Sequence, residues 1–306
     1  MAVIHSSDKD VPLDFAQAGK SRSLWVDAWG RLRRNKLAVF GVVVLLLLVL
    51  VAIFADVIAP YNYDQIVRDP VTNRTIKNQA PSAAHWFGTD DQSRDEFSRV
   101  VYGARVSLSV GLVSQAIILL VGIPIGLVAG YFGKGWDMIL MRITDIMYAF
   151  PTVLFAIVIL AAFGQNLINI YLAIGLTFWP PMARLVRSQV LSLREKEYVE
   201  SARAIGVSSR RIMFAQILPN ALGPIIVAAT FGIPFAILIE AFLSFIGLGV
   251  PVPIPSWGSM IARGREQLRS EPYLVLIPSM ALALTLFAFN FFGDGLRDAL
   301  DPRSRR

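Results

Sequence analysis

The side chains that could perform chemistry are few in this chain of 306 residues. It contains no cysteine, which excludes thiol nucleophiles, disulfide frameworks and cysteine-ligated metal sites. The two histidines, His5 and His85, lie far apart, and neither belongs to a metal-ligand pattern. Gly19-Lys20-Ser21 resembles the end of a phosphate-binding loop, but Asp14 occupies the position of the first glycine. No nucleophile, base and orienting group come together, so the sequence predicts neither a catalytic residue nor a metal site.

Four carboxylates lie close together in the sequence, without the spacing of a calcium-binding loop. Two arginines alternate with them, which is typical of a solvated loop held by salt bridges. We interpret this acidic group as such a loop. Its members are Asp90, Asp91, Asp95 and Glu96, together with Arg94 and Arg99.

The elements that carry the remaining side chains are long and apolar. Hydrophobic residues make up 55% of the chain and charged residues 17%, against about 25% charged residues in a soluble domain. A bilayer is spanned by about 20 apolar residues in a helix. Charged residues are absent from five runs that are long enough, and the chain is therefore predicted to be an all-α integral membrane protein. The runs are 37–55, 106–133, 146–183, 212–239 and 272–293.

The run 146–183 is too long for one span, and Gly164-Gln165-Asn166 interrupts it, which predicts a helical hairpin. The sequence thus predicts six transmembrane helices. The first is longer than the apolar core of a signal peptide, so we expect an uncleaved anchor. The predicted spans are 37–58, 107–130, 139–163, 167–183, 221–249 and 272–293.

Lysine and arginine predict the orientation, because cytoplasmic segments carry an excess of them. With both termini in the cytoplasm, the inner segments hold 20 of the 29 basic residues. The outer segments are then 59–105 and 250–271. The basic charge is therefore assigned to the membrane surface, and no nucleic-acid partner is expected. The inner segments are 1–36, 131–142, 184–211 and 294–306.

Glu240 is the one acidic residue well inside an apolar run, since 212–239 and 241–262 are free of charge. A carboxylate inside a membrane is costly, and it normally faces a protein interior or a water-filled path. We therefore expect Glu240 to line or gate a translocation path. The alternative is a structural hydrogen bond at a subunit interface.

The inner segment after residue 184 is predicted to form a helix–turn–helix. Gly206 stands where the end of a first helix, 195–205, requires a positive φ. Ser208 is a suitable N-cap for a second helix, which Pro219 is expected to end. The segment could lie on anionic lipid or contact an acidic partner. The first helix places its apolar residues on one face, namely Tyr198, Val199, Ala202 and Ile205.

Two further patterns concern helix packing and the outer segment. Gly122, Gly126 and Gly130 repeat every four residues, which predicts a close approach of another helix. In the segment 250–271, Ser256 is predicted to cap a short helix, and Trp257 is expected to anchor it at the depth of the lipid headgroups.

The helix–turn–helix resembles the EAA loop of ABC-importer permeases, in which Glu-Ala-Ala, a glycine and Leu-Pro follow at fixed spacing. Here the pattern reads Glu200-Ser201-Ala202, Gly206 and Leu218-Pro219. It departs from the family at Ser201 and Gln216. The resemblance implies that this loop, with Ile205 on its apolar face, docks into a cytoplasmic ATPase and transmits the closure of that ATPase.

Further stretches carry the same resemblance, in the same order along the chain. They are His85-Trp86-Phe87-Gly88-Thr89-Asp90, Met141-Arg142-Ile143-Thr144-Asp145, Leu243-Ser244-Phe245-Ile246-Gly247 and Pro255-Ser256-Trp257-Gly258. The chain from about 37 to 298 thus resembles the C-type permeases of the oligopeptide/dipeptide/nickel group of ABC importers.

This resemblance implies the fold of type I ABC importer permeases and a division of the chain. A cytoplasmic segment and a first helix precede a periplasmic loop, and a core of five helices contains a cytoplasmic coupling loop. The implied segments are 1–36, 37–58, 59–105, the core 106–298 with its coupling loop 187–219, and the tail 299–306.

The implied function is ATP-driven import of dipeptides or oligopeptides across a bacterial inner membrane. The chain is expected to hold no cofactor and to be no enzyme, because ATP and Mg bind two partner ATPase subunits. A related second permease subunit is implied as the partner in a heterodimer, while a homodimer stays open. A periplasmic or lipid-anchored binding protein is expected to contact Ser256 and Trp257, for which the alternative is an interfacial cap.

The cargo stays open within this group, because nickel, haem and glutathione importers share these motifs. A secondary transporter is a further alternative, but it would show two inverted repeats, which we do not find in the sequence. A membrane-embedded enzyme would need a catalytic partner for Glu240, and the sequence indicates none.

Overall fold

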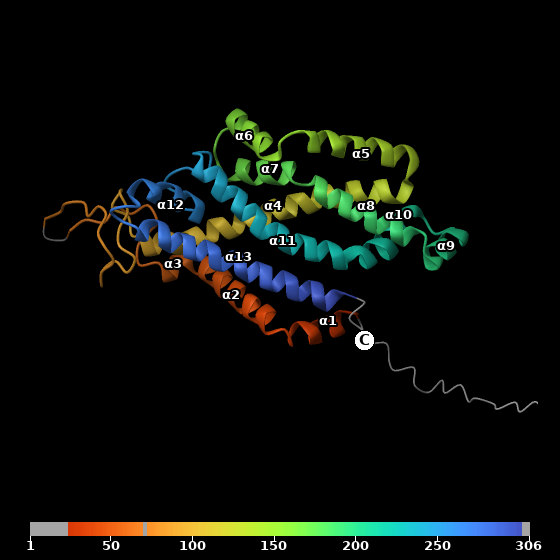
Figure 1. The fold of residues 1–306 in the computed structure, drawn as a ribbon, viewed down its shortest axis with the longest axis horizontal. Coiled ribbons are helices and arrows are strands. Elements are labelled where there is room, and N and C mark those ends of the chain that lie inside the picture. Colours follow the sequence, from red (N-terminus) through yellow and green to blue (C-terminus); the bar gives the residue numbers. More distant parts are fainter. Residues whose placement is uncertain (1–23, 70–71, 302–306) are drawn as a thin grey trace, which may run out of the picture.

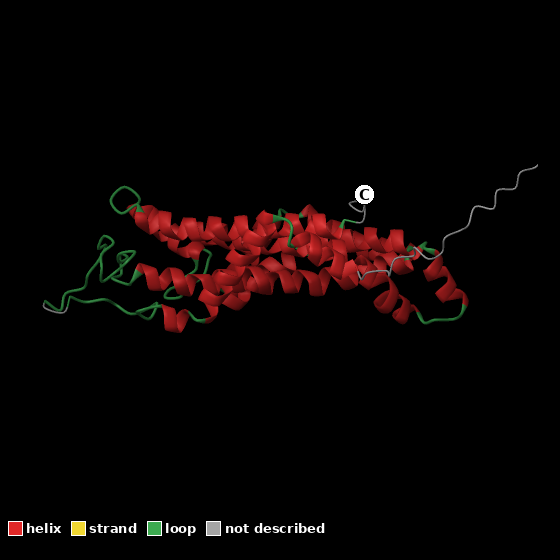
Figure 2. Ribbon diagram, turned by 90° about the horizontal axis from the view of Figure 1, so that it is seen from below, coloured by secondary structure: helices red, strands yellow, loops and turns green. Residues whose placement is uncertain are grey.

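The computed structural model describes residues 24–69 and 72–301, which form helices joined by loops (Figure 1, Figure 2). Within these ranges the only β-structure is two isolated bridges, Arg68 with Thr75 and Thr89 with Asp95. The expectations for His5, for Gly19-Lys20-Ser21, for most of the segment 1–36 and for the end of the tail concern residues outside this description.

The helices follow the apolar runs of the sequence, and their bounds are as follows. They are α1 (Leu24–Leu32), α2 (Lys36–Ile53), α3 (Ala55–Ile58), α4 (Glu96–Phe132), α5 (Lys134–Ala149), α6 (Thr152–Phe163), α7 (Leu167–Thr177), α8 (Pro180–Arg194), α9 (Glu197–Ala204), α10 (Ser209–Ile212), the π-helical turn η2 (Met213–Ile217), α11 (Leu218–Phe245), α12 (Trp257–Gly264), the 3₁₀ turn η3 (Arg265–Gln267) and α13 (Tyr273–Leu300).

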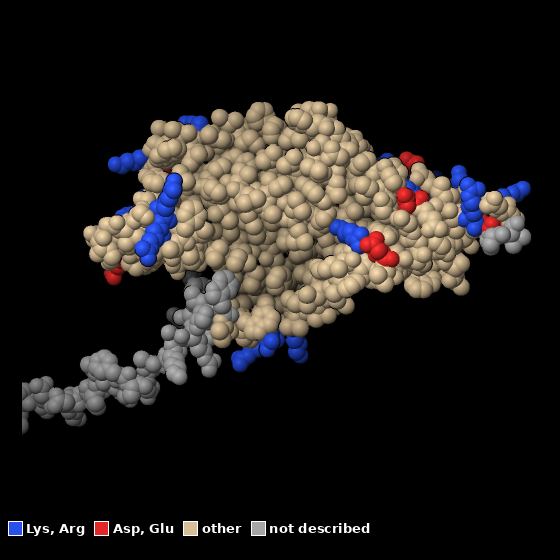
Figure 3. All heavy atoms as spheres, turned by 180° about the vertical axis from the view of Figure 1, so that it is seen from behind, with Lys and Arg blue, Asp and Glu red and all other residues tan. Residues whose placement is uncertain are grey.

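Four helices are long and apolar enough to cross a membrane: α2, α4, α11 together with the turns before it, and α13. They run side by side along the long axis of the molecule (Figure 1). Charged side chains gather toward the two ends of the face drawn in Figure 3 and leave a broad uncharged band between them. We call these ends the α9 end, which carries α9 and α10, and the α12 end, which carries α12 and loop 59–95.

The count of six spans is not confirmed. The described residues contain four spans by length and composition, or five if α5 and α6 together form one. The predicted single span 139–163 is wrong in shape, because α5 and α6 are bent by 83°. Phe150 adopts an extended conformation (φ −81°, ψ 136°) before Pro151, which disfavours helix at the preceding residue. α7 has 11 residues, or about 16 Å, so the span predicted at 167–183 needs part of α8 as well.

The glycine stripe of α4 packs against α8, as predicted. A Cβ added at Gly122 would lie 2.9 Å from Met182 Cβ, and one at Gly130 would lie 2.7 Å from Val190 Cβ. Because the paired positions increase together along the sequence, α4 and α8 are parallel. Side chains at the glycine positions would force the two helices apart, so the stripe sets their distance.

The described beginning and end of the chain lie side by side. α2 packs antiparallel to α13, since a Cβ at Gly41 would meet Ala288 O at 2.6 Å and one at Gly295 would meet Ala38 Cβ at 2.2 Å. Arg31 Nη1 donates a hydrogen bond to Asp301 O at 3.2 Å. Both ends therefore lie toward the α9 end (Figure 1), which agrees with an even number of crossings.

Candidate functional site

The loop 187–219 turns at Gly206, which has the predicted positive φ of 79°. Two backbone hydrogen bonds close α9: Gly206 N donates to Arg203 O at 3.0 Å, and Val207 N donates to Ala202 O at 3.0 Å. This arrangement is the Schellman motif, in which glycine adopts the left-handed conformation at least cost. A Cβ at Gly206 would meet nothing within 4 Å, so the glycine is needed for its backbone conformation and not for close packing.

The predicted apolar face of α9 is divided between two environments. Val199 and Ala202 are 0% and 5% exposed and belong to the apolar cluster formed by α4, α8, α10, η2 and α11. Tyr198 and Ile205 are 43% and 81% exposed. The expectation that Ala202 contacts a partner is therefore not supported, because its side chain attaches the loop to its own chain. Ile205 points outward because the chain turns away immediately after it.

The second helix of the loop does not end at Pro219, contrary to the sequence prediction. Ser208 is the N-cap of α10 without a side-chain hydrogen bond, and α10 continues through η2 into α11. Leu218 N donates to Met213 O, five residues earlier. This wider turn lets the helix continue although Pro219 has no N–H to donate. The second helix of the loop is therefore continuous with α11.

Four polar side chains on α9 and α10, at the tip of this loop, have no polar partner within the described chain. Glu200, Ser201, Arg210 and Arg211 are exposed, and no hydrogen bond or ion pair holds their side chains within the described ranges. The neighbouring α8 is braced more firmly. Its Arg187 Nη2 donates to Asp137 Oδ2 in α5 at 2.6 Å, and its Arg194 Nη1 donates to Gly130 O at 2.8 Å.

Glu240 lies in α11 and is completely enclosed by the chain. Its Oε1 accepts hydrogen bonds from Ser244 Oγ and Ser256 Oγ, both at 2.7 Å. Its Oε2 has no hydrogen-bond partner among the described residues. A Cβ at Gly258 would lie 3.0 Å from this Oε2, so glycine lets α12 approach. Glu240 therefore joins the start of α12 to α11, and it borders neither of the two large cavities described below.

Ser256 caps α12, as predicted. Ser256 Oγ accepts from Ser259 N at 3.1 Å, and Ser259 Oγ accepts from Ser256 N at 3.0 Å, which is a reciprocal capping box. Trp257 is only 1% exposed, and its Nε1 donates to Val100 O at 3.1 Å. The expectation that Trp257 lies at the headgroups is wrong, because the indole attaches α12 to α4. Neither Ser256 nor Trp257 presents its side chain to a partner.

The acidic group before α4 forms the predicted salt bridges, but all of its members except the exposed Asp91 are buried rather than solvated. Asp90 Oδ2 accepts from Arg94 Nε at 2.8 Å, and it lies 2.6 Å from Arg94 Nη2 and 3.4 Å from Arg99 Nε. Arg99 Nη1 also donates to Tyr63 O at 3.0 Å and to Pro253 O at 3.3 Å. The segments around Tyr63 and Pro253 therefore cover the group, and these contacts between distant parts of the sequence carry no local sequence signal.

His85 belongs to the same buried network, a role that the sequence did not indicate. Its Nδ1 lies 2.8 Å from Asp95 Oδ1. The other oxygen of Asp95 accepts from Ser98 N at 2.8 Å and thereby caps α4. The spacing Asp95-x-x-Ser98 ahead of an apolar run could have predicted this N-cap from the sequence.

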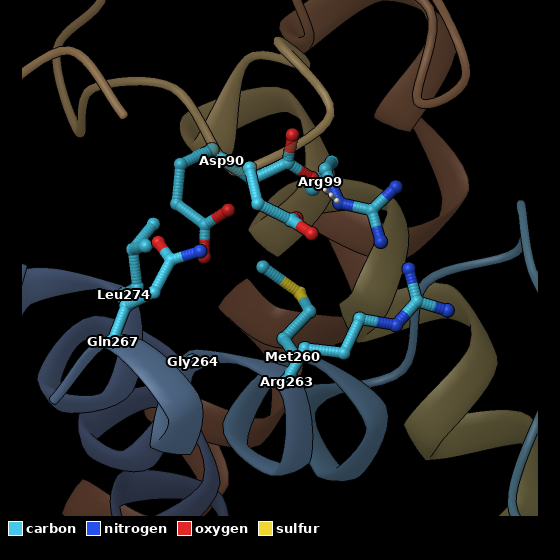
Figure 4. Close-up of a pocket in the computed structure, with 9 residues that line it drawn as sticks. Asp90, Arg99, Met260, Arg263, Gly264, Gln267 and Leu274 are labelled. Carbon is cyan, nitrogen blue, oxygen red and sulfur yellow. Dashed lines mark ion pairs between the residues drawn. The ribbon is translucent and has the colours of Figure 1, made fainter. Parts of the chain in front are cut away.

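Several cavities border these elements. One of about 480 Å³ lies between α4, the bend after α5, the start of α8 and α11, and its wall is mainly apolar. Another of about 440 Å³ lies at the α12 end. A small one of about 20 Å³ lies beside the acidic group, bordered by Asp90, Arg99, Met260, Arg263 and Gln267 (Figure 4). No group of three or more potential metal ligands occurs among the residues described.

Comparison with known families gives two matches. The family described as binding-protein-dependent transport system inner membrane component matches residues 122–306. The family described as the N-terminal TM domain of oligopeptide transport permease C matches residues 23–81.

Several proteins are similar over nearly the whole chain. The dipeptide transport system permease protein DppC of Alkalihalophilus pseudofirmus is 47% identical over 283 residues, which cover 92% of this chain and 91% of that protein. The oligopeptide transport system permease protein OppC of Bacillus subtilis is 43% identical over 287 residues, or 94% and 92% of the two chains. The glutathione transport system permease protein GsiD of Pectobacterium atrosepticum is 39% identical over 289 residues, or 92% of each chain.

Among solved structures, the fold is similar to that of a chain of the MetNI methionine ABC transporter. The TM-score is 0.54 at 19% sequence identity, and the match covers 66% of this chain and 96% of that one. This likeness establishes the helical arrangement of a type I ABC importer permease.

Proposed function

Because the chain belongs to the family of binding-protein-dependent transport system inner membrane components, and is a permease subunit of an ABC importer, we propose that it imports dipeptides or oligopeptides. The observation that carries this cargo is the identity of 47% and 43% to permeases of a dipeptide and an oligopeptide system, each over more than nine-tenths of the chain. Glutathione, which is also a peptide, is the weaker alternative at 39% identity.

The proposal includes the partners that such a permease requires. A related permease subunit pairs with this chain, and two ATPase subunits bind ATP and Mg on the cytoplasmic side. A periplasmic or lipid-anchored binding protein delivers the cargo at the opposite side of the bacterial inner membrane. The α9 end is assigned to the cytoplasm because the inner segments hold 20 of the 29 basic residues.

The coupling loop 187–219 transmits the motion of the ATPases. Its exposed residues, above all Ile205, enter the partner, while Val199 and Ala202 attach the loop to the helices of its own chain. The Schellman turn at Gly206 fixes the angle between the two halves. Because α10 is continuous with α11, a push on the loop is carried along that helix toward Glu240.

Glu240 acts as a latch, that is, as a side chain that holds α11 and α12 together, and it does not line the translocation path. Its two serine hydrogen bonds join α11 to the beginning of α12. A displacement of α11 that separates Glu240 from Ser256 would release α12 at the outer side. The segment 250–271 remains the proposed contact for the binding protein, through its exposed residues rather than through Ser256 or Trp257.

ATP-driven uptake by the complete importer tests the proposal. This chain is reconstituted in liposomes with its partner permease, ATPases and binding protein, and labelled tripeptide, glutathione and nickel are offered in parallel. Peptide uptake that requires ATP supports the proposal. Uptake of nickel without peptide would identify a nickel importer, and uptake that needs an ion gradient and no ATP would identify a secondary transporter. Either result would contradict the proposal.

Reporter fusions test the sides of the membrane. Fusions at residues 75 and 200 should report opposite sides, with residue 200 in the cytoplasm. Signals from the same side would show that the assignment of the two ends is incorrect.

A further inference from the structure

The cavity of about 440 Å³ at the α12 end has one apolar and one polar wall. The end of α11 and the following segment form the apolar wall, from Phe245 to Val252. The polar wall comes from α12, η3, the turn between α6 and α7, and Ser244 near the end of α11. Its members are Gln165, Ser244, Ser259, Arg263, Arg265 and Glu266. A cavity of this size and mixed wall is typical of a site for a small polar ligand.

Arg263 is the charged group in this wall that lacks a counterion. It makes no hydrogen bond or ion pair within the described ranges, and its Nη1 is buried without an acceptor. Figure 4 draws the small cavity beside the acidic group, which Arg263 also borders, and shows the Arg263 guanidinium directed toward that of Arg99. The nearby Asp90 is already held by Arg94 and Arg99. Burial and the neighbouring Arg94 lower the pKa of Arg263, against the opposing effect of Asp91 and Asp90, so its environment disfavours an unpaired positive charge.

The other charged residues of the wall form no ion pair with Arg263. Arg265 is exposed, and its guanidinium lies 4.5 Å from the centre of the Phe245 ring. Glu266 is exposed next to it. The wall thus carries two positive charges and one negative charge, and one bound carboxylate would balance it.

We propose that this cavity binds the C-terminal carboxylate of the peptide cargo, with Arg263 as the residue that recognises it. The proposal rests on the proposed function, since a peptide brings such a carboxylate. The planar guanidinium matches a carboxylate in geometry and charge. Gln165 can meet the adjacent peptide group, and the apolar wall can meet the last side chain of the peptide.

The position of Arg263 favours the cargo over a carboxylate on the surface of the binding protein. Arg263 is partly buried in a concave site, with one guanidinium nitrogen enclosed, whereas a docking residue would stand on the exposed rim. Arg269 on the same outer segment is exposed and does not line the cavity, as expected of a docking residue.

The experiment compares a peptide acid with its amide in the complete reconstituted importer. The binding protein is loaded with Ala-Leu-Ala or with Ala-Leu-Ala amide, and uptake is divided by the amount of loaded binding protein. Arg263→Gln should lower the uptake of the acid about tenfold or more, because a charged hydrogen-bond pair is lost. Uptake of the amide should change less than about twofold, because the amide lacks that charge.

Two further variants complete the test. Arg263→Lys keeps the charge without the planar group and should fall between the parent and Arg263→Gln for the acid. Arg269→Gln, at an exposed position of the proposed docking segment, should change the uptake of acid and amide by the same factor. An equal loss for acid and amide, with more binding protein needed for half-maximal uptake, would assign Arg263 to docking and overturn the proposal. An unchanged ratio of acid to amide would overturn it as well. If the parent imports neither peptide, the proposed function itself fails.

Discussion

The two ends of the molecule are held together by different forces. At the α12 end, buried charges and hydrogen bonds connect the acidic group with the start of α4, and α12 with α4 and α11. At the α9 end, Arg187 and Arg194 hold the α8 part of the coupling loop 187–219 by polar contacts, whereas α9 is attached by apolar packing of Val199 and Ala202. Polar networks require one geometry, whereas apolar contacts tolerate small shifts. The α12 end is thus a fixed frame, and α9 is held by contacts that tolerate small shifts.

The largest effect is expected from removing the charge at the centre of the frame. Asp90→Ala would leave Arg94 and Arg99 buried without their carboxylate, and loss of one partner in such a network costs about 3–5 kcal/mol. The thermal midpoint and the yield of the assembled complex should both fall sharply. Asp91→Ala, at an exposed neighbour, is the matched control and should leave both unchanged. Equal stability of the two variants would show that the network does not hold the frame.

A pair of substitutions in α9 separates attachment from docking. Ala202→Asp puts a charge into the apolar cluster and should destabilise the chain by roughly 3 kcal/mol or more, which thermal unfolding would detect. Ile205→Asp changes an exposed position, so the free energy of unfolding should change by less than about 0.5 kcal/mol. Uptake should nevertheless fall at least about tenfold in Ile205→Asp, because a charge enters a desolvated contact with the ATPase. Normal uptake in Ile205→Asp would assign the loop to the lipid surface.

These differences also mark how far the sequence alone could predict the structure. Charge-free runs locate the four long helices, because hydrocarbon excludes charge regardless of tertiary contacts. They miss the first turns of α4, since Glu96 to Arg105 lie outside the uncharged run although Asp95 caps the helix. They also miss the 83° bend at Phe150-Pro151, because an apolar run looks the same whether straight or broken.

The site was predictable only where local chemistry decides it. Gly206 and Ser256 were predicted correctly, because a positive φ and an N-cap depend on a few neighbouring residues. The environments of Ala202 and Trp257 depend on helices distant in sequence, and both side chains were assigned to the wrong surroundings. Glu240 was identified by its isolation, but its two serine partners emerge only from the packing of α12 on α11.

A smaller effect is expected at the elbow of the coupling loop. Gly206→Val forces a β-branched residue to φ 79°, which costs about 1–2 kcal/mol, although no neighbour blocks the side chain. The Schellman turn should open and change the angle of α9, so uptake and cargo-stimulated ATP hydrolysis should fall together while the complex still assembles. Gly206→Asn is the control, because asparagine tolerates this conformation best among the other residues. If the valine variant keeps both activities, the angle at Gly206 has no part in coupling.

The smallest effect is expected where the frame meets α11, at Glu240. Glu240→Gln keeps an oxygen that can accept from Ser244 and Ser256. The amide nitrogen would replace Oε2, which makes no hydrogen bond within the described chain, so no bond is lost there. Stability should therefore change by about 1 kcal/mol or less, and uptake should stay within about twofold. Glu240→Leu is the contrasting variant. It removes the acceptor and leaves two buried serine hydroxyls without it, so α12 should become more accessible to proteolysis and uptake should lose its dependence on the binding protein. This order, with leucine worse than glutamine, follows if the latch works through hydrogen bonds. A glutamine variant that assembles normally but transports nothing would instead show that the charge of Glu240 takes part in transport.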